Sequence, residues 1–210
     1  EELVKKQVET NKKLYWASSA ALVSMDNTDG KLLAMVWWPD YFDTENGGNN
    51  NMTIALRQPG SSFKPIVYTM AISKFPIWPE SPIADIETTF WKWKPDNYDR
   101  SFKGIMSLEK ALDYSRNIPA IKMFYLAWGE KEIVKVGKTL GLTSLREDAG
   151  YGAPMAIGTA EVRPIDLMQA YSVIANNGIK RDIYFIEKIE DSNWTALEEN
   201  KPSEWVEVLY

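Results

Sequence analysis

Two apolar runs early in the chain are separated by a short polar stretch. Residues 20–25 and 32–37 are hydrophobic, and residues 26–31 between them contain the Asp, Asn and Gly that favour turns. This pattern predicts a β-hairpin with a loop of five or six residues. The preceding residues 1–16 are polar and periodic enough for a linker or a short helix. The Gly- and Asn-rich residues 43–51 predict a loop.

The next apolar segment, residues 61–73, predicts a buried helix. Pro65 is tolerated only in the first turn of a helix, so we expect the helix to begin near Ser61 or Ser62. Apolar residues leave this helix almost no polar face: Ile66, Val67, Met70, Ala71 and Ile72. A helix of this kind is normally buried in the middle of a domain.

The remaining pattern predicts helices joined by irregular segments, and one late strand. Residues 74–103 are rich in proline and tryptophan, show little periodicity and predict a long irregular excursion. We expect helices over residues 107–114, 117–128, 131–140 and 164–176, and a strand over residues 184–189. In the second of these helices, four residues are expected to share one apolar face: Ile121, Phe124, Tyr125 and Trp128. The predicted class is therefore mixed α/β with a helical middle.

Composition narrows the chemistry that the chain can perform. Its 210 residues fit one domain or two small ones, and a net charge of −5 argues against nucleic acid as a partner. The sequence contains neither histidine nor cysteine. Their absence excludes Ser-His-Asp and Cys-His catalytic groups, zinc sites built from these residues, disulfides and iron–sulfur clusters. A general base acting at neutral pH must then be a carboxylate, a lysine or a tyrosine.

One candidate for such chemistry is the pair Ser61 and Lys64. Three residues apart on a helix, the two side chains share a face, and a lysine desolvated by apolar neighbours can act as a base near neutral pH. Chance alone supplies about one Ser-x-x-Lys in a chain of this composition. A second instance, Ser107 to Lys110, is interpreted as a helix cap followed by solvated charges. Only Ser61 follows a Pro-Gly turn and opens an apolar helix.

The second candidate is Ser115-Arg116-Asn117, between two predicted helices. As structural residues, Ser115 and Asn117 would close one helix and open the next. As functional residues, Ser115 would relay a proton, and Asn117 would hold Lys64 and a substrate amide. The two interpretations are compatible, because a cap residue at a helix junction is rigidly placed.

With these motifs in hand, the sequence resembles the transpeptidase domain of class A (bimodular) penicillin-binding proteins. Ser-x-x-Lys and Ser-x-Asn belong to the signature set of that superfamily. The similarity extends to the stretches ALVSMDNTDGKLLAMVWW, RQPGSSFKPIVYTMAI and YGAPMAIGTAEVRPIDLMQAYSVIANNGI, and covers roughly residues 17–190. The resemblance implies a β-lactamase/transpeptidase-like fold, in which helices flank a sheet and a helical subdomain borders the active site. The domain is assigned to residues 17–210, after a linker or short helix at residues 1–16.

One departure from the family pattern concerns its third motif, Lys-Thr-Gly on a sheet strand. The near match Gly137-Lys138-Thr139 lies inside a predicted helix and is interpreted as an ordinary helix end. Residues after Gly178 supply no such motif. The chain is therefore interpreted as a C-terminally truncated fragment, which we expect to acylate poorly by itself.

The resemblance implies a peptidoglycan D,D-transpeptidase that works through a serine acyl-enzyme. Ser61 would attack the D-Ala-D-Ala bond of a stem peptide, and Lys64 would take the hydroxyl proton. Ser115 would pass a proton towards the leaving amine, and Asn117 would orient Lys64 and the substrate. β-Lactams would acylate the same serine, and no cofactor or metal is needed.

The same resemblance sets expectations for partners and location. The partners would be stem peptides and β-lactams, not nucleic acid, and a glycosyltransferase domain would precede this domain in a longer protein. That protein would act on the extracytoplasmic face of the bacterial cell membrane. Membrane attachment would come only through a segment missing from this chain.

Two alternatives remain open at this stage. A glycan-binding or scaffold role would use Trp91 and Trp93, which alternate with lysines and could form a stacking platform. The simpler interpretation makes these aromatic residues core and loop anchors. A serine β-lactamase shares the first two motifs, but the segments around residues 57–68 and 151–178 resemble transpeptidases more closely.

Overall fold

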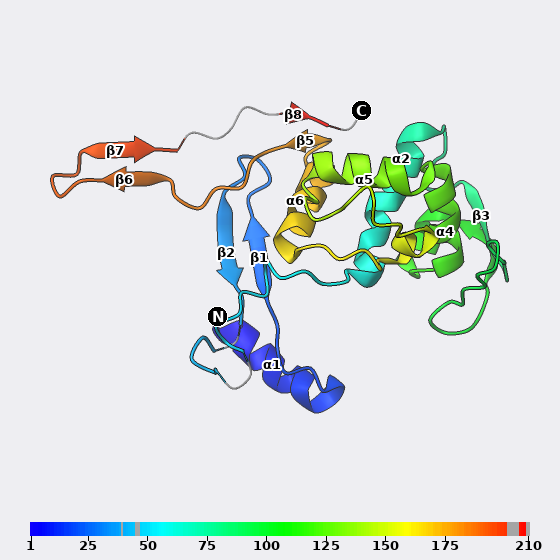
Figure 1. Ribbon diagram of the computed structural model, residues 1–210, viewed down its shortest axis with the longest axis horizontal. Coiled ribbons are helices and arrows are strands. Elements are labelled where there is room, and N and C mark those ends of the chain that lie inside the picture. Colours follow the sequence, from blue (N-terminus) through cyan, green and yellow to red (C-terminus); the bar gives the residue numbers. More distant parts are fainter. Residues whose placement is uncertain (39, 45–46, 201–205, 209–210) are drawn as a thin grey trace. The chain divides into compact units, whose positions relative to one another are not determined.

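The computed structural model describes residues 1–38, 40–44, 47–200 and 206–208. The chain divides into two compact units, one formed by residues 1–57 and 163–210 and the other by residues 58–162. Most helices belong to the second unit, which runs from cyan to yellow in Figure 1. The mixed class with a helical middle is therefore confirmed.

The first unit contains the predicted hairpin. Strands β1 (Leu22–Met25) and β2 (Leu32–Val36) pair antiparallel, with Val23 opposite Met35. The connecting loop closes through a hydrogen bond of 2.8 Å from the backbone N–H of Asp26 to the carbonyl of Lys31. Both the strands and the turn residues thus agree with the sequence pattern.

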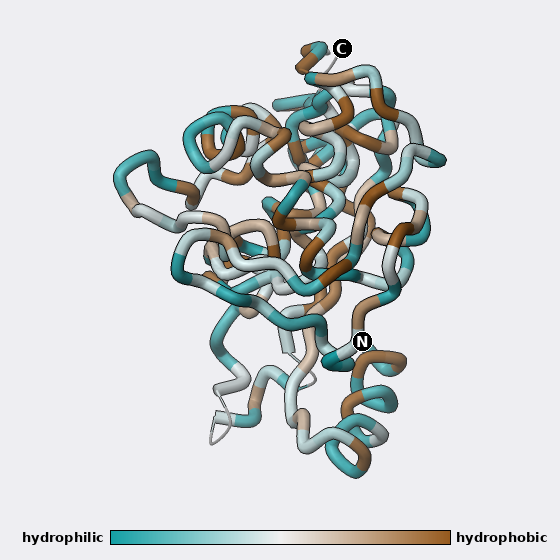
Figure 2. The backbone as a smooth tube through the Cα atoms, turned by 90° about the vertical axis from the view of Figure 1, so that its right-hand side faces the viewer, coloured by the Kyte–Doolittle hydropathy of each residue, from teal (hydrophilic) through white to brown (hydrophobic). Residues whose placement is uncertain are grey.

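Two helices accompany this hairpin in the first unit. Helix α1 (Glu2–Tyr15) buries only Val4 and Val8, and Figure 2 shows hydrophobic and hydrophilic residues alternating along it. Helix α6 (Pro164–Ala175) starts with Pro164 in its first turn and packs on β1. The predicted helix over residues 164–176 is confirmed.

The C-terminal part of the first unit forms short antiparallel pairs. Strand β5 (Ile179–Lys180) pairs with β8 (Val206–Glu207), and β6 (Lys188–Glu190) pairs with β7 (Ala196–Glu199). The strand predicted over residues 184–189 is wrong over most of its length. Residues 188–189 lie in β6 and Tyr184 forms an isolated bridge with Lys31, but Phe185 and Ile186 between them lie in no strand and are exposed. The sequence is apolar and β-prone over residues 205–210, of which Trp205, Leu209 and Tyr210 lie outside the described residues.

The second unit is built around one buried helix. A 3₁₀ turn, η1 (Gly60–Phe63), leads directly into helix α2 (Lys64–Lys74), with Pro65 in the first α-helical turn. The α-helix therefore begins a few residues later than predicted, and Ser61 lies in the 3₁₀ turn. The expected burial is confirmed for Ile66, Val67, Met70 and Ala71, which are at most 1% exposed. Ile72 is 39% exposed and does not belong to the buried face.

The excursion predicted to be irregular contains a strand. Strand β3 (Pro82–Asp85) pairs antiparallel with β4 (Gly104–Ser107), with Ile83 opposite Met106. Proline is tolerated as the first residue of a strand, because its missing N–H is not needed there. The prolines that suggested irregular structure thus permit a short two-stranded ribbon.

The other helices of the second unit follow the sequence pattern. They are α3 (Leu108–Asp113), α4 (Asn117–Leu126), α5 (Gly129–Leu140) and the 3₁₀ turn η2 (Ala153–Ile157). The apolar face expected on the second of them is only half correct. Ile121 and Phe124 are buried, but Tyr125 is 46% and Trp128 is 62% exposed. Within the described residues, no helix is both long and apolar enough to cross a membrane.

Candidate active site

Helix α2 buries a lysine amine in the second unit. Lys64 is the first residue of α2 and is 1% exposed, and its backbone N–H donates to the carbonyl of Ser61. The neighbouring Phe63, Ile66 and Val67 are fully buried. These apolar side chains exclude water, so the Lys64 amine depends on protein groups for its hydrogen bonds.

Those groups come from the second sequence motif. In the described part of the chain, Lys64 Nζ donates to the Ser115 carbonyl at 2.5 Å, to Ser115 Oγ at 3.1 Å and to Asn117 Oδ1 at 2.7 Å. All three acceptors are uncharged oxygens. The two motifs found in the sequence therefore meet at one amine.

Burial, and after it the positive charge of Arg116, lower the pKa of Lys64 to about 8. At pH 7 about a tenth of the amines would then be neutral, against a negligible fraction for an ordinary lysine. One helical turn further along α2, burial raises the pKa of the Tyr68 hydroxyl, so this tyrosine stays protonated. Lys64 is the better base of the two.

A tight helix junction places Ser115. The residue has a φ of 52°, in the left-handed region, immediately after α3. Its N–H donates to the carbonyl of Leu112 at 2.8 Å, and the N–H of Arg116 donates to that of Ala111 at 2.9 Å. Bonds of this kind close a helix C-terminus. The cap role expected for Ser115 is therefore present together with its contact to Lys64.

Asn117 opens helix α4 and has a fixed amide orientation. Its Nδ2 donates to the carbonyl of Asp96 at 2.8 Å, and its backbone N–H donates to Asn97 Oδ1 at 2.7 Å. Because Nδ2 is engaged with a carbonyl, Oδ1 is the atom left to face Lys64. The loop before β4 thus sets which end of the Asn117 amide meets the lysine.

Ser61 is exposed at the start of the same arrangement. It lies in the 3₁₀ turn before α2, three residues from Lys64. The described hydrogen bonds of the Lys64 amine go to Ser115 and Asn117 and not to the Ser61 hydroxyl. Bonds between a nucleophile and its base are often long or unformed without substrate, so this arrangement does not argue against a catalytic pair.

A close contact between two glycines fixes the turn that carries Ser61. Gly60 N–H donates to the Gly158 carbonyl at 3.2 Å, and the two residues have φ values of 57° and 82°. A Cβ at position 158 would overlap the backbone of Gly60. Sequence reasoning missed Gly158, because nothing local to it indicates a contact with a turn about a hundred residues away.

A buried ionic cluster supports the Ser115–Asn117 segment, and sequence reasoning missed this cluster too. Arg116 Nε donates to Asp85 Oδ2 at 2.8 Å, and Arg116 Nη1 donates to Asp99 Oδ2 at 3.0 Å. Arg116 Nη2 also donates to the carbonyl of Ser101. The Asp85 side chain is fully buried, and its Oδ1 accepts from Asn97 Nδ2 at 2.8 Å. A charged residue ending an apolar strand was a signal, but its partner could not be read from the sequence.

The second Ser-x-x-Lys, Ser107 to Lys110, and the near match to Lys-Thr-Gly at residues 137–139 have the structural positions expected of them. Ser107 Oγ accepts from the backbone N–H of Lys110 at 3.3 Å and caps α3. Residues 137–139 lie inside α5, which ends at Gly141 with a φ of 111°. Neither motif contributes to the arrangement around Lys64.

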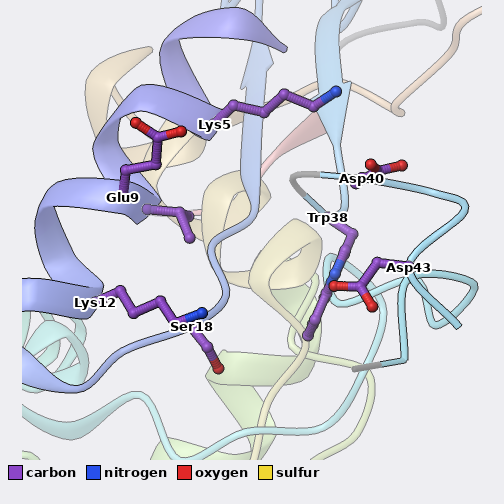
Figure 3. A pocket seen from close by; sticks show the side chains of 8 residues that line it. Lys5, Glu9, Lys12, Ser18, Trp38, Asp40 and Asp43 are labelled. Carbon is purple, nitrogen blue, oxygen red and sulfur yellow. The ribbon is translucent and has the colours of Figure 1, made fainter. Parts of the chain in front are cut away.

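A separate hollow of about 300 Å³ lies in the first unit (Figure 3). Helix α1 and the segment after β2 line it with both signs of charge: Lys5, Glu9, Lys12, Asp40 and Asp43. Trp38 and Ser18 also face it. Among its described lining residues, none is a predicted catalytic residue.

The geometry in the second unit suits nucleophilic acyl chemistry. It combines an exposed serine hydroxyl, a buried amine with a lowered pKa and a second exposed hydroxyl bonded to that amine. A lysine of this kind can activate a serine without histidine. The arrangement therefore provides a candidate nucleophile, a base and a proton relay.

Comparison with known proteins supports this interpretation. The family model described as "Penicillin binding protein transpeptidase domain" matches residues 20–208. Penicillin-binding protein 1A of Aquifex aeolicus is 35% identical over 201 residues, covering 90% of this chain and 26% of that protein. Penicillin-binding protein 1C of Escherichia coli is 31% identical over 162 residues, covering 77% of this chain and 21% of that protein. The chain thus spans about a quarter of the length of these curated relatives.

Solved structures give the same result for the fold. Penicillin-binding protein 1A from Haemophilus influenzae superposes with a TM-score of 0.76 at 29% identity, covering 88% of this chain and 27% of that one. PonA1 from Mycobacterium tuberculosis, in complex with penicillin V, has a TM-score of 0.76 at 21% identity and covers all of this chain and 58% of that one. The transpeptidase-like fold expected from the sequence is confirmed, and the chain belongs to the transpeptidase domain family of class A penicillin-binding proteins.

Proposed function

We propose that the chain carries the catalytic centre of a peptidoglycan D,D-transpeptidase. The observation that carries this proposal is the buried Lys64 amine, held at once by Ser115 and Asn117. A lysine kept away from carboxylates and water is suited to accept a proton from a serine. Membership in the transpeptidase family supplies the reaction class.

In the proposed reaction, Ser61 Oγ attacks the carbonyl between the two terminal D-alanines of a stem peptide. The hydroxyl proton moves to neutral Lys64 and then through Ser115 to the leaving amine. The C–N bond breaks, D-alanine departs and an ester to Ser61 remains. An amine of a neighbouring stem then attacks this ester, forming the cross-link and returning the proton to Ser61. The backbone N–H of Ser61 would be one donor to the oxyanion.

The proposal extends to ligands and setting through the relatives. The solved PonA1 structure contains penicillin V, and we propose that β-lactams acylate Ser61 in this chain. The whole protein would act on the extracytoplasmic face of the bacterial cell membrane, with a glycosyltransferase domain elsewhere in its length. The domain is proposed to extend over residues 17–210.

Labelling with a fluorescent penicillin tests this function. The complete encoded protein should be labelled, and peptide mapping by mass spectrometry should place the adduct on Ser61. Ser61→Ala should abolish labelling, whereas Ser107→Ala, the matched control in the other Ser-x-x-Lys, should leave it unchanged. An adduct on Ser107, or full labelling of Ser61→Ala, would refute the assignment.

A second candidate function is glycan binding, favoured by one observation. Trp91 is 93% exposed, whereas Trp93 is half-buried and lies 6.5 Å from Phe90 between ring centroids. Trp93 is therefore a loop anchor, and Trp91 is free to stack on a sugar. Pulldown on insoluble glycan should weaken in Trp91→Ala if this role exists, with Trp93→Ala as the comparison. Equal retention of wild type and Trp91→Ala would remove this candidate.

A further inference from the structure

Arg116 is the middle residue of Ser115-Arg116-Asn117 and shares its backbone with both partners of Lys64. Its side chain is 6% exposed and points its planar fork at Asp85 and Asp99. A guanidinium bound through several nitrogens has little freedom to move. Whatever fixes Arg116 therefore also fixes the groups on either side of it.

Asp85 anchors this arrangement from strand β3. Its Oδ2 accepts from Arg116 Nε at 2.8 Å and from the backbone N–H of Lys103 at 3.0 Å, while its Oδ1 accepts from Asn97 Nδ2. Asn97 is 3% exposed and passes the connection on, since its Oδ1 accepts from the Asn117 N–H at 2.7 Å. Two routes, through Arg116 and through Asn97, thus join one buried carboxylate to the segment that holds Lys64.

The cluster also sets the charge around the lysine. Elements packed on α2 include α4 and α5, besides the turns η1 and η2. On α4, Lys122 donates to the carbonyl of Ala84 at 2.6 Å. On α5, Glu132 pairs with Lys74, and Glu130 accepts from the N–H groups of residues 151 and 152. On α2 itself, Tyr68 stays protonated. Arg116 is the charged group that acts on the pKa of Lys64 in addition to burial.

We propose that Arg116 and Asn97, both anchored on Asp85, are positioning residues for acyl transfer. They hold Ser115 and Asn117 in contact with the Lys64 amine before substrate arrives. This inference rests on the proposed function for its kinetic consequence, but the placement of Lys64 can be measured without turnover.

The first test compares charge changes at the two ends of the buried ion pair. Arg116→Met, Asp85→Asn and the double variant are made in the complete encoded protein. Lys64 is titrated by NMR after reductive ¹³C-methylation, with its signal assigned from Lys64→Arg. We expect the midpoint to rise in Arg116→Met, to fall in Asp85→Asn and to lie between these in the double variant. If the ion pair had a purely structural role, the two single variants would not shift the titration midpoint of Lys64 in opposite directions.

The second test measures the rate of penicillin acylation in the same variants. Arg116→Met should slow acylation at pH 7 by tenfold or more. Asn97→Ala, which removes the acceptor of the Asn117 N–H without changing charge, should slow it by a similar factor while leaving the midpoint of Lys64 in place. Arg116→Lys keeps the positive charge but lacks the planar guanidinium that binds Asp85 and Asp99. This variant is used in the test if Arg116→Met does not fold. It should also acylate slowly.

Glu132→Gln is the matched control, because it breaks another ion pair to helix α2 away from Ser115. It should lower thermal stability slightly and leave both the acylation rate and the Lys64 midpoint unchanged. Acylation rates within twofold of wild type in both Asn97→Ala and the folded Arg116 variant would overturn the inference, as would an unmoved Lys64 midpoint in a folded Arg116→Met. If the wild type is not acylated at Ser61, the proposed function fails, and the midpoints alone then decide whether Arg116 acts on Lys64.

Discussion

Two lysines on helix α2 occupy opposite kinds of environment. Lys64, at the start of the helix, is buried and bonded to neutral oxygens. Lys74, at the end, pairs with Glu132 at 2.9 Å and lies 4.5 Å from the centre of the Trp128 ring. The same residue type is thus held without a counterion at one end and with one at the other.

This difference separates the amine proposed as the general base from one that forms a structural ion pair. Without a carboxylate, burial lowers the pKa of Lys64 to about 8, so a useful fraction is neutral near physiological pH. At the other end, the hydrogen bond from Lys74 lowers the pKa of the Glu132 carboxyl, which favours its ionised form. The two lysines thus differ both in burial and in their acidic partner, since Lys64 is 1% exposed and the paired Lys74 side chain is 25% exposed.

The strongest test of the comparison exchanges each lysine for methionine. Lys64→Met should reduce the rate of penicillin acylation by about 10²–10⁴, the usual contribution of a general base. Lys74→Met should leave the rate within about twofold, because it removes only a structural pair. Stopped-flow or gel-based labelling would measure both rates. Comparable losses in the two variants would abolish the distinction.

The pH dependence of the acylation rate should sharpen the comparison between Lys64 and Lys74. Acylation should rise about tenfold per pH unit below a midpoint near 8 and level off above it, because only neutral Lys64 accepts the proton. The lysine also affects stability with a defined sign. Its pKa falls on folding from 10.5 to about 8, so its contribution to the free energy of unfolding decreases as pH falls through that window. A pH-independent acylation rate between pH 6 and 9 would contradict the role of Lys64.

Asn117→Ala should have an intermediate effect. It removes the 2.7 Å acceptor of Lys64 and the bond to Asp96, while Ser115 still holds the amine. We expect acylation to slow by about one to two orders of magnitude and stability to fall by about 1 kcal/mol. Kinetics combined with a thermal melt would separate the two effects. An unchanged rate would reduce Asn117 to a residue that only opens α4.

The smallest effect on stability is expected from breaking the ion pair between Lys74 and Glu132 at the end of α2. Glu132→Gln should cost about 0.2–1 kcal/mol of stability at pH 7, as exposed or half-exposed ion pairs do. Because the pKa of Glu132 is lowered on folding, this contribution is present above its ordinary value near 4.5 and is lost at lower pH. Urea unfolding at pH 7 and pH 3 would show the difference between variant and wild type shrinking on acidification. A constant difference would mean that the ion pair contributes nothing.

Patterns among neighbouring residues predicted most helices and the first hairpin, but they could not predict pairing between segments far apart in the sequence. The hairpin of β1 and β2 and the stop of α5 at Gly141 depend on neighbouring residues and were predicted correctly, as was the buried face of α2 except for Ile72. The pairing of β3 with β4 joins segments about twenty residues apart, with prolines that favoured an irregular assignment. The strand over residues 184–189 failed because alternation alone does not tell whether a core lies beside it.

The site shows the same division. Ser61, Lys64, Ser115 and Asn117 were proposed from short motifs and a family resemblance, and the structure brings the last three into hydrogen-bond contact. The described contacts join Ser61 to Lys64 through their backbones, and they include no bond between the Ser61 hydroxyl and the Lys64 amine. The groups that fix the site, Asp85, Asn97 and Gly158, carry no motif, because their role exists only once distant segments meet.

The contact between Gly60 and Gly158 also bears on when, during synthesis, the turn that carries the proposed nucleophile Ser61 gains its backbone support. Gly158 is made about a hundred residues after Gly60. At roughly 5–20 residues per second, this segment takes on the order of 5–20 s to synthesise. During that interval the turn carrying Ser61 lacks the hydrogen bond between Gly60 and Gly158. We therefore expect that a nascent chain does not react with penicillin until residue 158 has joined the fold. Ser61 is thus synthesised well before the residue whose contact supports its turn.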